Sequence, residues 1–174
     1  MASEPRPIAL VGSMGAGKTT VARALGERLG VSVADLDAML AAEAGRSIPE
    51  LFETEGESEF RRRERRAMEA ALAAGVRVLA CGGGIVTDPG SRALLATRCH
   101  VIWLAVSPEV AAARIRDQRA GRPLAAGPNP VARLAALARE RDPLYAGVAA
   151  TRIETDHRTP AEVLEAVLAA LPPA

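Results

Sequence analysis

The chain has 174 residues and a formal net charge of +1, and 49% of its residues are hydrophobic while 25% are charged. This length and composition suit one globular domain, and a nearly neutral chain has no general attraction for nucleic acid or for an anionic membrane. Two Phe, one Trp and one Tyr are the only aromatic residues, which are few for a protein that stacks on nucleic-acid bases.

No apolar run approaches the roughly 20 residues that a membrane-spanning helix needs. Residues 1–7 lack the basic-then-apolar pattern of an export signal. We therefore expect a cytoplasmic protein with no nucleic-acid partner and no membrane partner, and we expect a monomer.

Short apolar runs alternate with segments of helical periodicity along the chain. The runs predict strands at residues 8–11, 31–34, 76–80, 101–106 and 151–155. The periodic segments predict helices at residues 18–29, 37–44, 58–74, 89–97, 108–119, 130–141 and 160–171. Capping boxes at Ser47–Glu50 and Thr159–Glu162 predict the start of a further short helix and of the last helix. This alternation predicts a single α/β domain over residues 1–174, with a parallel sheet covered on both faces.

The first predicted strand leads into a complete phosphate-binding motif, G-x-x-x-x-G-K-[ST], which opens the first predicted helix. Glycines let backbone N–H groups turn toward an anion, and the helix N-terminus adds positive potential. We expect Lys18 to reach the β- and γ-phosphates of ATP and the Thr19 hydroxyl to bind Mg²⁺. The predicted nucleotide-binding residues are Gly12, Ser13, Met14, Gly15, Ala16, Gly17, Lys18, Thr19 and Thr20.

Lys18 is the only lysine among the 22 Lys and Arg residues of the chain. An ammonium group approaches phosphate as a compact point charge, whereas a guanidinium group is a wide planar fork. The presence of the only lysine at this position favours a phosphate site over an ordinary glycine-rich turn.

Acidic residues follow the second predicted strand, at Asp35 and Asp37, while the third strand ends without one. The missing acid after the third strand argues against a motor ATPase or a GTPase. We therefore expect Asp35 to bind the metal through water. Asp37 has two readings: it orients an acceptor hydroxyl and takes its proton, or it caps the next helix. Arg61 and Glu64 share a helix face and are either site residues or a surface ion pair.

Six motifs together resemble the shikimate kinase family over nearly the whole chain, from residue 8 to residue 171. They are the phosphate-binding loop, D-x-D at Asp35–Asp37, F-R-x-x-E with Phe60, Arg61 and Glu64, G-G-G at Gly82–Gly84, R-P-L at Arg122–Leu124, and R-x-P-L-Y at Arg141–Tyr145. The loop alone indicates only nucleotide binding, whereas the ordered set is specific.

The resemblance implies transfer of the γ-phosphate of MgATP to the 3-hydroxyl of shikimate, on the route to chorismate and aromatic amino acids. It implies that Asp37 holds the ring hydroxyls, that Arg61 and Arg141 bind the carboxylate, and that Glu64 orients Arg61. The backbone of the glycine motif would pack against the ring, and the implied residues there are Gly82, Gly83 and Gly84.

For the nucleotide, the resemblance implies that Arg122 closes on the transferred phosphate from a lid at residues 119–128, and that Arg158 stacks on adenine. It also implies an acceptor-binding segment at residues 35–64 and a three-layer P-loop kinase fold, in which helices flank a five-stranded parallel sheet in the order 2-3-1-4-5. The chain departs from the family pattern in three places: Leu36 stands within D-x-D, Ala125 follows R-P-L, and the arginine before the lid is out of register, with candidates at Arg114, Arg116 and Arg119.

Two other functions remain open from the residues. A kinase for gluconate or a nucleoside monophosphate would use the same phosphate loop, although two arginines and an acid suit a carboxylated polyol better than a base. A nucleotide-binding regulator without phosphoryl transfer is the second. ADP production with and without shikimate separates these readings.

The two cysteines lie at opposite ends of predicted strands. Cys81 ends the third strand and Cys99 precedes the fourth. A strand of about five residues spans roughly 16 Å, beyond the roughly 7 Å Cα separation that a disulfide allows. We predict two free thiols.

Overall fold

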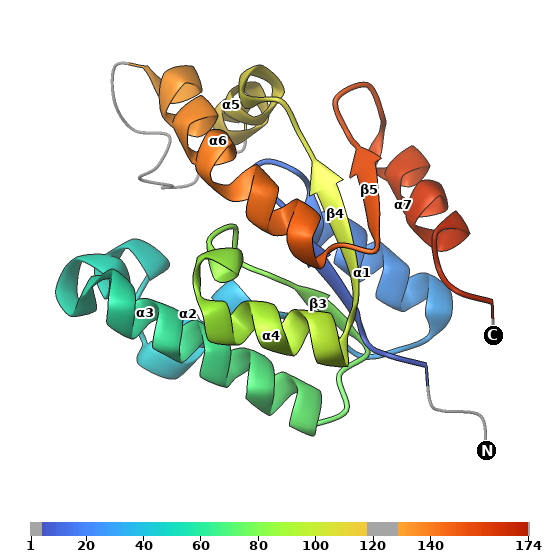
Figure 1. Ribbon diagram of the computed structural model, residues 1–174, viewed down its shortest axis with the longest axis horizontal. Coiled ribbons are helices and arrows are strands. Elements are labelled where there is room, and N and C mark those ends of the chain that lie inside the picture. Colours follow the sequence, from blue (N-terminus) through green and yellow to red (C-terminus); the bar gives the residue numbers. More distant parts are fainter. Residues whose placement is uncertain (1–4, 118–128, 174) are drawn as a thin grey trace.

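The computed structural model describes residues 5–117 and 129–173. In this part of the chain, strands and helices alternate as the sequence predicts (Figure 1). The elements are β1 (Ile8–Val11), α1 (Lys18–Leu29), β2 (Val33–Asp35), α2 (Leu36–Ala44), α3 (Ile48–Ala73), β3 (Val78–Ala80), the 3₁₀ helix η1 (Ile85–Thr87), α4 (Pro89–Arg98), β4 (His100–Ala105), α5 (Pro108–Asp117), α6 (Pro130–Val148), β5 (Thr151–Glu154) and α7 (Pro160–Ala169).

The five strands form one parallel sheet in the order β2-β3-β1-β4-β5, which confirms the predicted order. β1 lies at the centre, where Leu10 is in register with Ala80 of β3 and with Ile102 of β4. Because the strands are parallel, their carboxyl ends meet at one edge, where ligands bind in sheets of this kind. The phosphate loop follows β1, the three glycines follow β3, and Asp35 is the last residue of β2.

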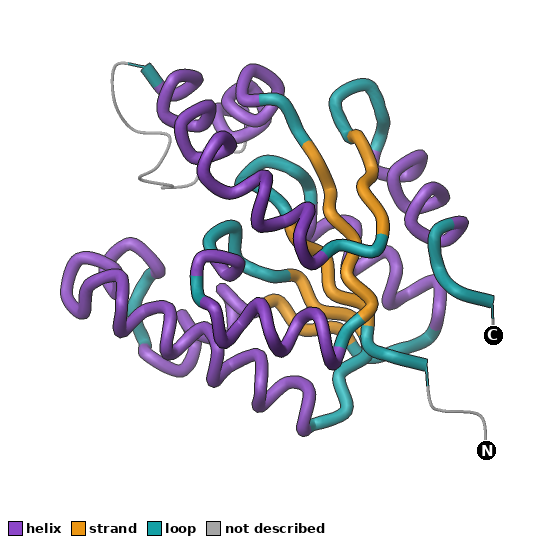
Figure 2. Tube along the Cα trace, in the orientation of Figure 1, coloured by secondary structure: helices purple, strands orange, loops and turns teal. Residues whose placement is uncertain are grey.

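Helices cover both faces of the sheet, so the strands are sandwiched between two apolar layers (Figure 2). Successive residues of β1 alternate between the layers: Ala9 and Val11 belong to one buried cluster, and Ile8 and Leu10 to the other. α1 and α7 pack on the second face, while α3, α4 and α6 contribute to the first. The phosphate loop thus rests on a strand buried on both sides.

Local signals placed most helix ends correctly. The capping boxes at Ser47 and Thr159 are both formed, and Gly30 and Gly45 end their helices in the left-handed conformation. α3 joins the two helices predicted on either side of Gly56, which is non-helical at φ 78° and marks a kink between them.

The prediction for residues 130–141 was too short, because α6 continues to Val148 with Pro143 inside it. A proline in a helix interior removes one backbone hydrogen bond and costs about 3 kcal/mol. Tyr145 is fully buried beyond it, and Leu144 and Val148 pack on the same core cluster. Burial of this last part of the helix offsets the proline.

Cys81 and Cys99 are free, as predicted, and both are buried. Burial raises the pKa of both thiols, that of Cys99 to about 11. In residues 5–117 and 129–173, no helix combines the length and apolar character that crossing a bilayer requires.

Candidate active site

The phosphate loop follows β1 at the centre of the sheet edge and turns directly into α1. Gly12 has φ 142°, and a Cβ atom there would lie 2.2 Å from the Leu104 carbonyl oxygen of β4. Only glycine fits this close approach of the loop to the neighbouring strand. Gly15 and Gly17 also have positive φ values, a backbone conformation that in loops of this kind turns successive N–H groups toward an anion.

The Lys18 ammonium lies inside this loop. Its Nζ donates to the carbonyl oxygens of Gly12, at 2.7 Å, and Ser13, at 2.9 Å. These bonds hold the charge over the cradle of N–H groups. The arrangement suits an anion that carries several phosphate oxygens.

Thr19 and Asp35 come together at the start of α1. The Thr19 hydroxyl donates to Oδ2 of Asp35 at 2.6 Å, and Oδ1 of the same carboxylate accepts from the Ala38 backbone N–H at 3.1 Å. Asp35 therefore caps α2, so the capping role considered for Asp37 belongs to Asp35. The side-chain oxygen atoms of Thr19 and Asp35 are ligands of the kind that Mg²⁺ prefers. Within residues 5–117 and 129–173, no group of three or more His, Cys, Asp or Glu side chains is placed to hold a metal alone, so phosphate oxygens and water would complete such a site.

The pair formed by Arg61 and Glu64 is buried, so it is no surface ion pair. Glu64 is fully buried and Arg61 is 8% exposed, and Nη1 of Arg61 donates to Oε2 of Glu64 at 2.7 Å. The guanidinium also lies 5.6 Å and 5.3 Å from the ring centroids of Phe52 and Phe60. Its position is therefore determined by an ion pair and two aromatic faces.

The three glycines lie against these charged groups. A Cβ atom on Gly84 would lie 1.9 Å from Nη2 of Arg61, so glycine is required for the guanidinium to remain there. A Cβ atom on Gly82 would lie 2.2 Å from Oε1 of Glu64 and 2.8 Å from Oδ1 of Asp37. Both carboxylates thus face the same small space above Gly82.

Arg141 reaches the same place from α6. A Cβ atom on Gly83 would lie 3.7 Å from Nη1 of Arg141, and 3.5 Å from both the Gly12 carbonyl oxygen and the Met14 backbone nitrogen. The loop that holds Gly82, Gly83 and Gly84, called the triglycine loop below, therefore lies close beside the phosphate loop. Among the described residues, the buried atoms without a hydrogen-bond partner include Nε of Arg61, Nε of Arg141 and Oε1 of Glu64. The two unpaired donors suit a carboxylate, and the unpaired acceptor suits a hydroxyl group.

Arg114 joins the phosphate loop to the end of β5. Its guanidinium donates to the Gly15 carbonyl oxygen at 3.1 Å, to the Thr155 hydroxyl at 3.0 Å and to the Thr155 carbonyl oxygen at 2.6 Å. Arg114 is thus an arginine before the lid that lies against the nucleotide loop, while Arg119, also considered, lies outside the described residues. Arg158 is exposed in the segment between β5 and α7, and its backbone N–H donates to the Thr155 carbonyl oxygen at 3.2 Å.

Comparisons with known proteins decide the family. The family model described as shikimate kinase matches residues 14–172. This chain belongs to the shikimate kinase family. The shikimate kinases of Symbiobacterium thermophilum and Thermobifida fusca are 44% and 45% identical to it, over 162 and 170 residues. The matches cover 92% and 97% of this chain, and 93% and 97% of those proteins.

The solved structures agree with this assignment. The shikimate kinase of Acinetobacter baumannii, determined in complex with shikimate, is 40% identical and superposes with a TM-score of 0.87. The match covers 95% of this chain and 92% of that one. The P-loop kinase fold predicted for the chain is therefore confirmed, and membership of the shikimate kinase family makes it an ATP-dependent kinase.

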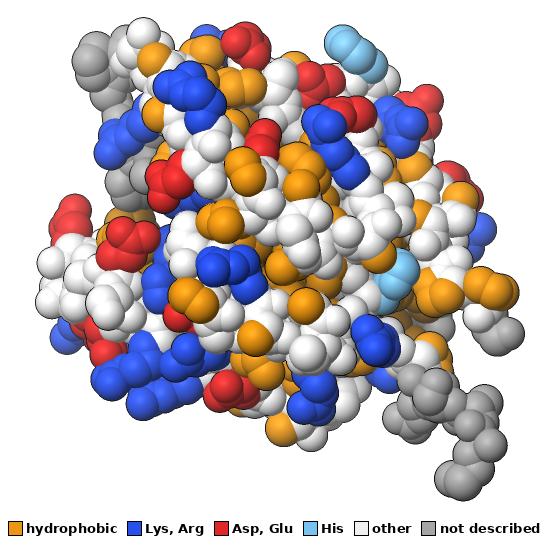
Figure 3. Space-filling view, in the orientation of Figure 1, with side chains coloured by type: hydrophobic (Ala, Val, Ile, Leu, Met, Phe, Trp, Pro, Cys, Tyr) orange, Lys and Arg blue, Asp and Glu red, His pale blue; other side chains and the backbone are white. Residues whose placement is uncertain are grey.

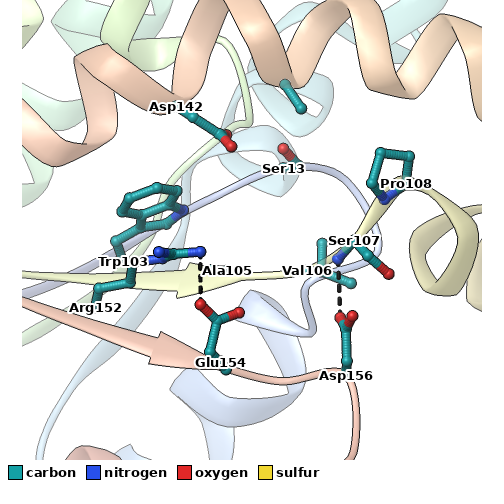
Figure 4. A pocket seen from close by; sticks show the side chains of 11 residues that line it. Ser13, Trp103, Ala105, Val106, Ser107, Pro108, Asp142, Arg152, Glu154 and Asp156 are labelled. Carbon is teal, nitrogen blue, oxygen red and sulfur yellow. Dashed lines mark hydrogen bonds and ion pairs between the residues drawn. The ribbon is translucent and has the colours of Figure 1, made fainter.

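A pocket of about 180 Å³ opens beside the phosphate loop of this shikimate kinase family member, beneath α6 (Figure 4). Asp142, Glu154 and Asp156 line it together with a single arginine, Arg152, which pairs with Glu154 and stacks on Trp103. Asp156 also accepts from the Ser107 backbone N–H at 2.8 Å. Ser13 of the phosphate loop also lines the pocket, so this acidic pocket adjoins the phosphate site.

The arginine-rich run on α3 carries little free positive charge. Figure 3 shows acidic side chains beside the basic ones over this helix. Ion pairs join Arg61 to Glu57 and Glu64, Arg62 to Glu59, Arg63 to Glu43 and Glu55, and Arg65 to Asp88. Neighbouring carboxylates thus neutralise most of the positive charge of this run.

Some predicted residues cannot be placed and some contacts were not foreseen. Arg122 and the whole of the predicted lid at 119–128 lie outside the described residues. Sequence reasoning singled out no role for Tyr145, whose hydroxyl donates to the Gly83 carbonyl oxygen. The R-x-P-L-Y motif was the one signal that pointed to it.

Glu64 has a shifted pKa that gives a measurable pH dependence. Burial raises its pKa from 4.5 to about 7, the charge of Asp37 adds to this, and Arg61 and Arg141 oppose it. Between these two pH values the folded protein holds a proton that the unfolded chain has lost. We therefore expect the free energy of unfolding to fall as the pH rises from about 4.5 to about 7, by up to about 1.4 kcal/mol per pH unit.

Urea unfolding of the wild type and of Glu64→Gln at several values between pH 5 and 8 tests this expectation. The variant should lose the slope, because glutamine does not titrate. Glu53→Gln, at an exposed position of the same helix, is the matched control and should keep it. Identical slopes in wild type and Glu64→Gln would show that Glu64 titrates normally.

Proposed function

We propose that this protein transfers the γ-phosphate of ATP to the 3-hydroxyl of shikimate, giving shikimate 3-phosphate and ADP. The product belongs to the route to chorismate and the aromatic amino acids. The supporting observation is the close approach of the phosphate loop to a cluster of Asp37, Glu64, Arg61 and Arg141 around three glycines, in which Glu64 and Arg61 are buried. This cluster matches a small ring that carries a carboxylate and hydroxyls.

Each side chain of the cluster has a proposed role. Arg61 and Arg141 bind the carboxylate with charge-assisted hydrogen bonds, and Glu64 holds Arg61 in place. The backbone of Gly82, Gly83 and Gly84 lies under the ring, where side chains would collide with the charged groups.

The transfer forms a bond between the 3-oxygen of shikimate and the γ-phosphorus, and breaks the bond between that phosphorus and the oxygen that leaves with ADP. Asp37 orients the hydroxyl and takes its proton as the new bond forms. Lys18 neutralises charge on the β- and γ-phosphates, where negative charge is shared in the transition state.

We propose Mg²⁺ as the cofactor, held by the Thr19 hydroxyl and, through water, by Asp35. The 2.6 Å contact between these two side chains brings hard oxygen ligands together at the start of α1, where they suit this ion. Bound Mg²⁺ would neutralise charge on the phosphate oxygens.

The remaining contacts to ATP are proposed from the family pattern. Gly12, Ser13, Met14, Gly15, Ala16, Gly17 and Thr20 belong to the phosphate loop and the first turn of α1. Arg122, from a lid at 119–128, would approach the transferred phosphate. Arg158 would stack on adenine, and Arg114 supports this assignment because it joins the loop that holds Arg158 to the phosphate loop.

We also propose that the protein is one domain that acts as a cytoplasmic monomer. The donor and acceptor residues described above all come from one chain and one sheet edge. Gel filtration at two protein concentrations tests the monomer.

A coupled assay of ADP release tests the function. Shikimate, quinate, gluconate and nucleoside monophosphates are each supplied with MgATP, and one reaction receives no acceptor. We expect release that depends on shikimate, and detection of shikimate 3-phosphate as the product. A preference for gluconate or a nucleotide would identify the alternative kinase, and no acceptor-dependent release would indicate a binding protein.

A further inference from the structure

Tyr145 is a fully buried side chain at the meeting point of several elements. It lies four residues after Arg141 on α6, so both face the same side of the helix. Its ring centroid is 5.6 Å from that of Trp103 on β4, and its hydroxyl donates to the Gly83 carbonyl oxygen. The ring therefore belongs to the core, while the hydroxyl reaches the triglycine loop.

The side chains of Ser13 and Arg141 lie near the same hydroxyl, where they lower the pKa of Tyr145 against the effect of burial. The hydroxyl thus donates to the triglycine loop and lies near the phosphate loop and an arginine proposed to bind the acceptor. Burial raises the pKa of Tyr145 to about 12, so the group stays protonated and continues to donate to Gly83 at ordinary pH.

The triglycine loop and the phosphate loop lie close beside each other. A Cβ atom on Gly83 would lie 3.5 Å from the backbone of both Gly12 and Met14. The donor phosphate and the acceptor hydroxyl would be bound on these two loops, so a shift of one loop against the other changes the distance between the reacting atoms. A misplacement of about 1 Å can lower a rate by roughly 10²-fold.

We infer that the Tyr145 hydroxyl is a positioning group for phosphoryl transfer, which holds the phosphate loop, the triglycine loop and Arg141 in one fixed arrangement. The inference rests on the proposed function. Tyr145 does not act on the reacting atoms: it acts through the Gly83 backbone, Ser13 and Arg141.

Tyr145→Phe tests the inference because it keeps the ring and its packing on Trp103 and removes only the hydroxyl. We expect kcat/KM for shikimate to fall roughly 10- to 100-fold, with kcat lowered as well as KM for shikimate raised. The KM for ATP should change less than about threefold, because Lys18 and the loop glycines are intact.

Ser91→Ala is the matched control. Ser91 is fully buried, and its hydroxyl donates to Oδ2 of Asp88 at 3.0 Å, away from these two loops. It should lose a comparable amount of thermal stability and keep the wild-type kinetic constants. A lower Tm shared by both variants, with loss of kcat/KM in Tyr145→Phe alone, supports the positioning role.

Two results would overturn the inference. The first is a folded Tyr145→Phe protein with the wild-type kcat/KM for shikimate, since the hydroxyl would then serve the core only. The second is full additivity of the effects of Ser13→Ala and Tyr145→Phe on kcat/KM. If the two side chains act together, the double variant should have a kcat/KM only slightly below that of the less active single variant.

If Tyr145→Phe does not fold, Ser13→Ala probes the same junction from the phosphate loop. It should lower kcat/KM, and wild-type kinetics there would overturn the inference. A wild-type protein that does not phosphorylate shikimate is a different result, since it would refute the proposed function itself.

Discussion

Lys18→Arg should lower kcat by roughly 10²–10³-fold, although the charge is kept. The Lys18 ammonium sits between the carbonyl oxygens of Gly12 and Ser13, at 2.7 Å and 2.9 Å. A planar guanidinium is too wide for a cradle of this size, so it would approach the phosphates from a different position. Steady-state assays of ADP release with saturating shikimate measure the effect.

Arg28→Lys is the matched control for this variant. Arg28 lies in the last turn of the same helix and pairs with Glu165 of α7 at the surface. This variant makes the opposite substitution, arginine to lysine, at a surface position outside the site, so kcat should stay at the wild-type value. A near-normal kcat in Lys18→Arg would contradict the assigned role of the lysine.

Chemical labelling gives a second view of the same residue. Since Lys18 is the only lysine, an amine-selective reagent can modify only this side chain and the N-terminus. Labelling of Lys18 should parallel loss of activity, and MgATP should protect against both, while shikimate alone should protect poorly. Loss of activity without modification of Lys18 would show that another group is responsible.

Arg141→Ala should raise the KM for shikimate strongly, with a smaller effect on the KM for ATP. Removal of one partner of a buried charged pair costs about 2–5 kcal/mol, and the lower figure corresponds to roughly 30-fold. The most direct measurement compares shikimate with its methyl ester. The wild type should prefer the acid, and the variant should lose most of this preference because the guanidinium recognises the carboxylate.

Arg61→Ala is the companion variant, and it should differ in stability. It also removes the ion-pair partner of the fully buried Glu64, whose pKa Arg61 lowers. Glu64 must then be buried without its partner, so this variant should unfold at lower urea concentration than Arg141→Ala. Unchanged acid-over-ester preference in both variants would remove both arginines from the acceptor site.

Much of the fold could be predicted because its signals are local. The phosphate loop is one contiguous motif between a strand and a helix, and capping boxes and glycines near helix ends act through neighbouring residues. The alternation of strands and helices predicts a parallel sheet, and the family pattern supplied its strand order. Helical periodicity failed to locate the end of α6, because Pro143 is a local stop signal that burial of Tyr145 overrides.

For the site, the sequence by itself determined which side chains are available: one lysine in a glycine-rich loop, acids after the second strand, and arginines in recurring motifs. Only the tertiary structure decided their states. It buried Glu64 beside Asp37 and raised its pKa, gave the capping role to Asp35, and joined Tyr145 to Gly83. Residue order encodes backbone conformation over a few positions, whereas desolvation and hydrogen bonding depend on which distant segments pack against each side chain.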